Sequence, residues 1–311
     1  MLATLLRLFF SIDFLQAAIR FSTPLLSASI GESISEKAGM VNVSLEGMML
    51  CGALGAVLGV QYTGSLWGGI LFGILSGVLI ALIQGFFSIT LAVNQVVVGI
   101  ALNIFSLGAT SFVLRWIYGV SGSQPVQGFD PLPIPVLSKI PVLGDLLFNH
   151  SVLVYVVYLL IPVVTFILTR TEWGLKLRAV GEHPEAADSL GVSVARTRYI
   201  AILLCGAFSG LAGCFLSLVQ LNMFVEGMTG GRGFIALAVV IVGKWTPWRL
   251  ALAALLFGAL DALALRAQAL AIGLPYQLLL ALPYLVTLLV YAGLVGQARQ
   301  PAALSKPYIR D

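Results

Sequence analysis

The sequence predicts an all-α fold, a polytopic bundle of transmembrane helices, on three observations. Hydrophobic residues make up 59% of the chain and charged residues only 10%, and the mean hydropathy of +1.02 lies far outside the range of soluble globular domains. No Asp, Glu, Lys or Arg occurs from Gly47 to Leu114. About 20 apolar residues suffice to cross the hydrocarbon core of a bilayer, so this run alone can hold three crossings.

Charge and cysteine usage narrow the function. The net charge of +4 is modest, and excess Lys and Arg in a membrane protein usually mark cytoplasmic loops rather than a nucleic-acid surface. Cys51, Cys205 and Cys214 lie in apolar segments without metal-type spacing, which indicates packing residues. No phosphate-binding Gly-x4-Gly-Lys-Ser/Thr motif occurs, because Lys244 is followed by Trp245. We therefore expect no ATP hydrolysis and no metal or cofactor in this chain itself.

Stretches poor in charged residues divide the single transmembrane domain, residues 1–311, into about nine candidate spans. In chain order these are 20–36, 46–62, 65–89, 94–117, 151–169, 199–220, 230–244, 248–266 and 275–296. Counting spans backward places the N-terminus outside, against the basic residues Arg7 and Arg20, so Ile12–Phe21 is expected to form an amphipathic helix on the outer face. The next three divide the charge-free run, and the fifth separates two polar loops. Short segments that contain polar residues, proline or glycine separate the last four.

The two long polar loops set the expected orientation. The loop 118–150 holds five prolines and a single basic residue, Lys139, whereas the loop 170–198 holds five basic residues. The positive-inside rule places the first loop outside the cell and the second in the cytoplasm. Counting spans from these loops puts the C-terminus in the cytoplasm and the N-terminus outside.

Short matches indicate that the two halves of the chain repeat one another. Two tripeptides recur, Glu46-Gly47-Met48 as Glu226-Gly227-Met228 and Leu71-Phe72-Gly73 as Leu256-Phe257-Gly258, and Asn94-Gln95-Val96 has a counterpart in Tyr276-Gln277-Leu278. The order is the same and the offsets are 180, 185 and 182 residues. Chance similarity in a chain rich in Gly and Leu is the alternative. Matched segments lie five spans apart and so run in opposite directions, which predicts an inverted repeat of residues 15–120 and 195–296.

Polar, glycine-containing segments interrupt the apolar sequence in both halves, at Gly31–Glu46 and Glu226–Gly233. Broken helices persist at membrane depth only where protein or a water-filled cavity satisfies their backbone groups. These segments therefore either line a translocation path or form loops at the membrane surface. The candidate residues for such a path are Asn42, Asn94, Asn103, Glu226 and Arg232. Hydrogen bonding between helices is the alternative role for the three amides.

Two further patterns concern helix packing. Glycines at helical spacing, Gly69-x3-Gly73-x3-Gly77 and Gly206-x3-Gly210, predict closely packed helices. Asp261 and Arg266 share one span, where a charge at mid-membrane costs about 2.5–3.5 kcal/mol. We expect these two residues to pair or to reach the membrane surface rather than to bind cargo.

The segment Glu182–Gly191 is expected to form a short cytoplasmic helix offered to a soluble partner. Pro184 suits the first turn of a helix, Glu185 lies near its positive end together with Glu182, and Gly191 lets the chain turn away. The expected apolar ridge consists of Ala186, Ala187 and Leu190. An ordinary solvated loop is the alternative.

Three motifs resemble those of a known family. Glu185-Ala186-Ala187-x3-Gly191 resembles the coupling motif of ABC importer permeases, although the Ile-x-Leu-Pro ending of some members is missing. The segment Gly31–Met49 resembles the N-terminal signature of the sugar, nucleoside and branched-chain amino acid permease family. Gly231–Ala238 with Trp245-Thr246-Pro247 resembles the second signature, in the form typical of the nucleoside branch. The similarity runs from about residue 15 to 296.

This resemblance implies a permease subunit of a bacterial importer, embedded in the cell membrane. It implies a second permease, often a different chain, and an external lipoprotein or periplasmic protein that delivers nucleosides. ATPase subunits on the inside would bind ATP and Mg²⁺. The helix at 182–191 would insert into a groove on the ATPase and transmit closure of the ATPase dimer to the flanking spans.

Other functions remain open at this point. A permease of the same family for a simple sugar such as ribose suits an uncharged path nearly as well. A self-sufficient secondary transporter or channel usually carries an intramembrane acidic residue, for which Asp261 is the candidate. A scaffold or an intramembrane enzyme is disfavoured, because no His-Glu-x2-His or Gly-x-Ser-x-Gly motif occurs.

Overall fold

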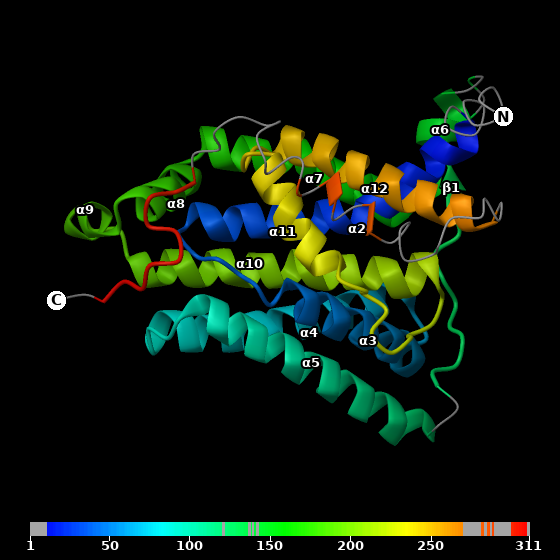
Figure 1. Cartoon of the computed structure of the whole chain (residues 1–311), viewed down its shortest axis with the longest axis horizontal. Helices are drawn as coiled ribbons and strands as arrows, with labels where there is room; N and C mark the ends of the chain where they lie inside the picture. The colour runs from blue at the N-terminus through cyan, green and yellow to red at the C-terminus, as the bar shows by residue number, and fades with distance from the viewer. Residues whose placement is uncertain are drawn as a thin grey trace.

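The computed structural model describes residues 11–119, 122–135, 138, 140, 143–269, 281–282, 285–286, 288 and 300–309. In these ranges the chain consists of long helices and one small antiparallel ribbon (Figure 1). The helices are α2 (Ile12–Lys37), α3 (Leu45–Thr63), α4 (Leu66–Gly85), α5 (Gln95–Tyr118), α6 (Leu143–Phe148), α7 (Val152–Arg170), α8 (Glu172–Glu182), α9 (Pro184–Ser189), α10 (Val194–Phe215), α11 (Arg232–Val242) and α12 (Pro247–Ala269). The π-helical turns η1 (Phe86–Thr90) and η4 (Leu216–Gln220) continue α4 and α10, and the ribbon pairs β1 (Pro131–Pro133) with β2 (Asn149–Ser151).

Six of the described helices are long and apolar enough to cross a membrane, namely α3, α4 with η1, α5, α7, α10 with η4, and α12. Helix α11 has only 11 residues, which rise about 16 Å, roughly half the thickness of a bilayer core. The prediction of a full span over 230–244 is therefore wrong, and the total of about nine spans is not confirmed. The predicted span 275–296 lies almost wholly outside the described residues.

Helix α2 is one continuous helix of 26 residues. Residues Ile12–Phe21 are helical as predicted, but they form the first turns of α2 rather than a helix lying on a surface. The first turns of α2 pack against α12 instead: Phe14 and Ala18 are buried, and a Cβ at Gly258 of α12 would lie 2.5 Å from the carbonyl oxygen of Ala18. This close packing stabilises the helix from Ile12, eight residues before the first predicted span begins at residue 20.

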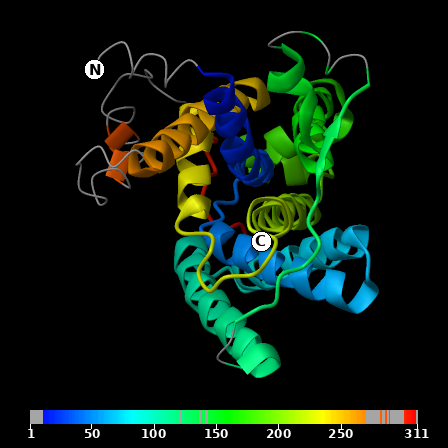
Figure 2. The ribbon, with the colours of Figure 1, turned by 90° about the vertical axis from the view of Figure 1, so that its right-hand side faces the viewer.

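The long helices α2 and α10 lie side by side through the middle of the molecule (Figures 1 and 2). Helix α12 packs along α2, and α4 packs along α10. Viewed along its axis in Figure 2, α10 lies between the group formed by α3, α4 and α5 and the group formed by α2, α7, α11 and α12. The arrangement places α8, α9 and residues 300–309 at one end, called here the α9 end, and α6 with the ribbon at the other.

Glycines allow α3, α4 and α10 to approach closely. A Cβ at Gly210 of α10 would lie 2.6 Å from the carbonyl oxygen of Gly73 in α4, and one at Gly52 of α3 would lie 2.7 Å from the Cα of Gly210. Neither position has room for a side chain. The predicted close packing at the glycine seams is confirmed.

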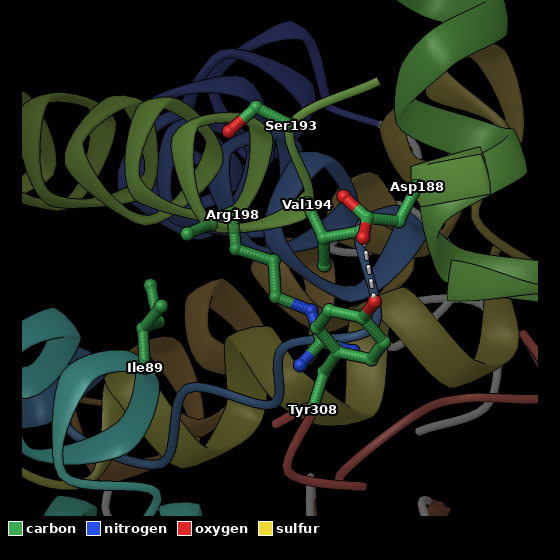
Figure 3. A pocket seen from close by; sticks show the side chains of 7 residues that line it. Ile89, Asp188, Ser193, Val194, Arg198 and Tyr308 are labelled. Carbon is green, nitrogen blue, oxygen red and sulfur yellow. Dashed lines mark hydrogen bonds between the residues drawn. The ribbon is translucent and has the colours of Figure 1, made fainter. Parts of the chain in front are cut away.

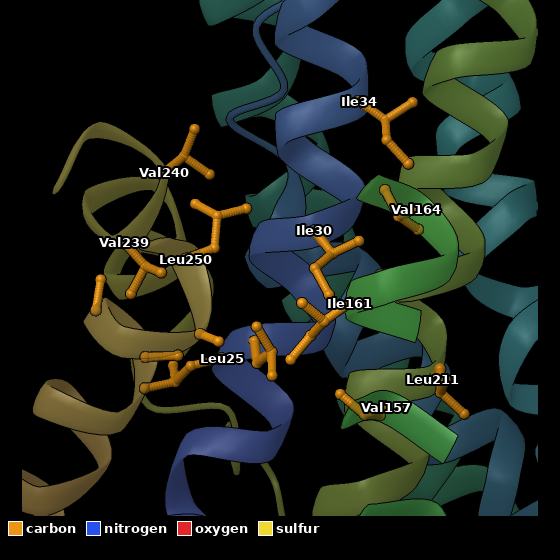
Figure 4. Close-up of a cluster of buried hydrophobic side chains, with 14 of the residues drawn as sticks. Leu25, Ile30, Ile34, Val157, Ile161, Val164, Leu211, Val239, Val240 and Leu250 are labelled. Carbon is orange, nitrogen blue, oxygen red and sulfur yellow. The ribbon is translucent and has the colours of Figure 1, made fainter. Parts of the chain in front are cut away.

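Aliphatic side chains from α2, α7, α10, α11 and α12 form a large buried cluster (Figure 4). Leu25 and Ile30 of α2 and Leu250 of α12 have no exposed surface. Lipid is as apolar as these side chains, so close van der Waals packing holds such a cluster together rather than removal from water. In contrast, the outer faces of α4 and α5 expose large side chains such as Leu79 and Phe112, as expected of surfaces that face lipid or another apolar partner.

Two helix breaks interrupt the bundle and position the candidate site. The first break, residues 38–44, joins α2 to α3 and contains Gly39 at φ +84°. The second break, residues 221–231, joins η4 to α11 and contains Gly227, Gly230 and Gly231 at φ +66°, +54° and +87°. Glycine adopts these left-handed conformations without the Cβ clash that other residues meet.

Candidate functional site

The two helix breaks meet at the carboxylate of Glu46, in the first turn of α3. Its Oε1 accepts a hydrogen bond from the backbone N–H of Gly231 and its Oε2 accepts one from Gly233, each at 2.7 Å. The first N–H groups of α11 have no partner within that helix, and the positive end of the helix dipole favours a negative charge there. Glu46 therefore caps α11 from a helix in the other half of the chain.

Two of the predicted path residues hold the first break in place. The side-chain oxygen of Asn103, on α5, accepts from the N–H of Gly47 at 2.8 Å, and its nitrogen donates to the carbonyl of Val43 at 2.9 Å. Asn42 is fully buried, and its oxygen accepts from the backbone N–H of Ser44 at 3.0 Å. Both amides are thus engaged in hydrogen bonds within the protein.

Two buried carboxylates on α2, Glu32 and Glu36, anchor neighbouring segments. Glu32 has no exposed surface, and its Oε1 accepts from the backbone N–H of Asn42 at 2.9 Å. The thiol of Cys205 on α10 donates to the other oxygen of Glu32 at 3.3 Å. Glu36 accepts a hydrogen bond from the indole N–H of Trp245. Helix α2 therefore holds both the first break and the turn that follows α11.

Glu32 and Glu36 were not predicted from the sequence as individual site residues. The signal available in the sequence was their spacing, because residues four apart lie on one face of a helix. Two acidic residues on one face, next to apolar sequence, indicate buried carboxylates that need hydrogen-bond donors. Their donors come from the break, from α10 and from the α11–α12 turn, which sequence spacing does not bring together.

Arg232 begins α11 and lines a cavity of about 300 Å³ together with side chains of α2, η4 and α12. Its Nε lies 4.0 Å from Oδ2 of Asp261, and both side chains are largely shielded from solvent. Arg266 instead donates to the hydroxyl of Ser11 at 2.7 Å. Asp261 thus has its ion pair with Arg232 on another helix, in agreement with the expectation that it pairs or reaches the membrane surface.

Glu226 lies in a different hollow, of about 470 Å³, at the end of α5 away from α9. Its carboxylate lies 3.4 Å from Arg115, with both side chains exposed. The hydroxyl of Ser111 and the guanidinium of Arg115 stabilise the charged form and lower the pKa of Glu226 below its usual value. Asn94 is exposed at the opposite end of α5, where it caps the helix by accepting from the N–H of Val96 at 2.9 Å. Arg232 and Glu226 therefore line two different hollows, and Asn94 lies at the opposite end of α5 from Glu226.

The segment expected to contact a partner does form a short helix, α9. Pro184 is its first residue, Glu185 lies in its first turn, and Glu182 ends α8 just before it. Gly191 has φ +85° and donates to the carbonyl of Asp188 at 2.9 Å, which ends the helix and turns the chain toward α10. A short helix is thereby presented at one end of the molecule (Figure 1).

The apolar ridge expected on α9 differs from the prediction at one residue. Ala187 is buried against Val180 of α8 and Val194 of α10, because it is the contact through which α9 rests on its neighbours. Ala186 is exposed, and Leu190 is 85% exposed. Leu190 thus projects from α9 as an exposed apolar side chain, while Ala187 holds the helix against its neighbours.

A small cavity of about 150 Å³ lies beneath α9 (Figure 3). Its lining combines Asp188 of α9 and Arg198 of α10 with Tyr308 from near the end of the chain. The hydroxyl of Tyr308 donates to Oδ2 of Asp188 at 3.1 Å, and the figure shows the two side chains facing one another. Residues more than a hundred positions apart thus meet at this end.

The described fold is that of a multi-pass helical membrane protein with interrupted helices and an exposed helix at one end, features of the membrane subunits of transporters. Residues 14–291 match the family model for the permease component of branched-chain amino acid transport systems. The chain therefore belongs to this family of ABC transporter permeases.

Comparison with known proteins finds relatives over nearly the full length of the chain. The guanosine ABC transporter permease protein NupQ of Bacillus subtilis is 35% identical, covering 94% of this chain and 95% of NupQ. The nucleoside ABC transporter permease protein NupC of Lactococcus lactis is 34% identical with the same coverage. TsgC13 of Haloferax volcanii, assigned as a glucose ABC transporter permease, is 37% identical over 97% of this chain and 99% of its own.

A solved structure of an inward-facing transporter, assigned to the metal-chelate type of ABC transporter, has a similar fold. The TM-score is 0.50 at 20% identity, over 90% of this chain and 85% of that one. The likeness concerns the fold alone.

Proposed function

We propose that this chain is the permease subunit of an ATP-driven importer that carries nucleosides across a bacterial cell membrane. The observation that carries the proposal is the match of 94% of the chain to two permeases of nucleoside systems at 35% and 34% identity. A simple sugar is the second candidate cargo, because a relative assigned to glucose transport is 37% identical. Uncharged cargo of either kind is compatible with a path through spans that carry few charged residues.

The paired helix breaks support an alternating-access mechanism. Helices α2, α3 and α4 correspond in order to α10, α11 and α12: α12 packs on α2 as α4 packs on α10, and α11 packs on α2 as α3 packs on α10. This correspondence supports the inverted repeat of residues 15–120 and 195–296. Glu46 bonds the two halves of the chain to one another where α3 and α11 begin. A rocking movement of one half relative to the other therefore shifts the positions of both breaks.

Helix α9 with its flanking residues, Glu182–Gly191, is the proposed docking surface for the ATPase subunit, which binds ATP and Mg²⁺. The support is the exposed Leu190, the carboxylates of Glu182 and Glu185, and the basic residues of 170–198, which favour a cytoplasmic location for the α9 end and for the C-terminus. The loop 118–150 and the N-terminus then lie outside, where a nucleoside-binding protein delivers cargo. A second permease, a related chain, completes the pathway, and the exposed apolar face of α5 is a surface for that chain or for lipid.

ATP-dependent uptake tests this function in vesicles that hold the chain, a second permease, the ATPase and the external receptor. We expect labelled guanosine or uridine to accumulate, with no competition from ribose, glucose or leucine. Competition by a sugar alone would change the cargo but keep the class. Uptake that persists without the ATPase would instead support a self-sufficient transporter.

A separate variant tests the proposed docking surface. Leu190→Asp is expected to abolish co-purification of the ATPase and uptake together, because a charge replaces the projecting apolar group. Glu172→Ala is the matched control, since its side chain is 92% exposed on the neighbouring helix and takes part only in a solvent-exposed pair with Lys176. Normal ATPase binding by Leu190→Asp would contradict the assignment of α9.

A further inference from the structure

Residues 300–309 cross the α9 end as an ordered strap, drawn in red in Figure 1. The N–H of Ala303 donates to the carbonyl of Gly181 on α8 at 2.9 Å, and the N–H of Ser305 donates to the carbonyl of Gly39 at 3.1 Å. Chain ends are usually poorly ordered unless specific contacts hold them. Here the backbone of the strap bonds both to α8 and to the start of the first helix break.

A buried arginine on α10 bonds to both the strap and the first helix break. Arg198 on α10 is only 2% exposed. Its Nε donates to the carbonyl of Ala38 and its Nη1 to the carbonyl of Lys306, each at 3.2 Å. A buried charge is retained only where such hydrogen bonds compensate its desolvation. The guanidinium of Arg198 therefore donates hydrogen bonds to both the strap and the break.

The far end of the strap holds α9 itself. Tyr308 packs on the small apolar cluster of Val180, Ala187 and Val194 that seats α9, and its hydroxyl donates to Asp188 at 3.1 Å (Figure 3). An O–H donor to a carboxylate is a charge-assisted bond, stronger than a bond between neutral groups. The ring completes the seat of α9, and the hydroxyl ties α9 to the strap.

We propose that this C-terminal strap is a coupling element that links movement of α9 to the first helix break. The inference rests on the proposed role of α9 as the ATPase contact. The chain of contacts runs from Asp188 through Tyr308 along the strap to Gly39, and in parallel through Arg198 to Ala38. Displacement of α9 by the ATPase pulls on the break through these contacts, in addition to the path through α8.

The strap packs closely against the first helix break at Gly39. A Cβ at Gly39 would lie 3.1 Å from the carbonyl oxygen of Ala303 and 3.1 Å from Nη2 of Arg198. The residue also has φ +84°, which favours glycine. A side chain at this position would push the strap away from the break.

The test compares Tyr308→Phe and Asp188→Asn with Ile309→Ala in the assembled transporter. Ile309 follows Tyr308 in the strap but is 73% exposed, which makes it a matched control. The readouts are co-purification of the ATPase, ATP hydrolysis, and nucleosides imported per ATP hydrolysed. We expect Tyr308→Phe to keep ATPase binding and hydrolysis while the transport ratio falls about tenfold, the effect of losing one charge-assisted hydrogen bond.

The double variant Asp188→Asn with Tyr308→Phe distinguishes coupling from simple loss of structure. If the two groups act through one bond, the double variant is no worse than the more impaired single variant. Independent, additive losses, or an unchanged transport ratio in Tyr308→Phe, would overturn the proposal. Should Leu190→Asp leave uptake intact, the role of α9 fails first, so the two failures are distinguishable.

Discussion

The carboxylate of Glu46 is expected to form the main hydrogen bonds between the two helix breaks, and variants that remove the carboxylate test this directly. Glu46→Ala leaves the N–H groups of Gly231 and Gly233 without their acceptor. Glu46→Gln keeps one carbonyl oxygen but turns an N–H₂ group toward the other donor, so one of the two bonds survives. The two variants therefore remove two bonds and one bond from the same place.

The expected loss follows from the two 2.7 Å bonds. A hydrogen bond to a charged group contributes about 1.5–3 kcal/mol to stability. Because Glu46 is only half-buried, water replaces part of each bond, and the lower value applies. Glu46→Ala is thus expected to cost about 3 kcal/mol and Glu46→Gln about half of that. For a chain of this size, about 3 kcal/mol lowers the thermal midpoint by roughly 6 °C.

Thermal unfolding in detergent measures this loss with a dye that fluoresces when it reacts with thiols. Cys205 and Cys214 have no exposed surface, so they react only when the helices separate. Glu172→Ala, an exposed carboxylate beside α9, is the control and should melt as the parent protein does. A midpoint for Glu46→Ala within about 1 °C of the parent would refute the assigned capping role.

Three further predictions concern packing, pH and surface charge. Gly210→Ala is expected to lower the thermal midpoint by the equivalent of about 1–3 kcal/mol through overpacking, whereas Gly108→Ala, where a Cβ would meet nothing within 4 Å, should raise it slightly through better helix propensity. Burial lowers the pKa of His150, so the folded ribbon favours the neutral ring, and its stability is full above about pH 6.5 and falls as pH decreases through the unfolded pKa toward the folded one. Hydrogen exchange of the ribbon at about pH 7.5 and 5.5 should show this loss, and His150→Gln should abolish it. Glu226→Gln should leave the midpoint unchanged, because its pair with Arg115 is exposed; a lower midpoint would show a structural role.

The candidate site could be predicted in part. Pro184 and Gly191 indicated the start and end of α9 correctly, because a proline suits a first helical turn and a glycine adopts φ above zero at little cost. The sequence did not show that Ala187 faces inward. A helix of six residues is too short for its periodicity to define a face, and the contacts of α8 and α10 decide which side is buried.

Charged residues in apolar sequence were harder to assign. Asp261 and Arg266 are close in sequence, yet Asp261 lies near Arg232 of another helix. Glu46 was noted as part of a repeated tripeptide, but its partners are backbone N–H groups, and a backbone donor leaves no mark in the sequence. Pairing across helices depends on the packing of the bundle, which local spacing does not specify.

The sequence by itself determined that this chain is a helical membrane protein, where most of its long apolar helices lie, and that glycines and charges interrupt two of its segments. These properties follow from transfer free energies and backbone preferences, which act locally along the chain. Only the tertiary structure decided that α11 is a half-length helix capped by Glu46, and that the C-terminal strap meets α9 and Gly39. Those features are hydrogen bonds between segments far apart in the sequence, and they form only when helix packing brings donor and acceptor together.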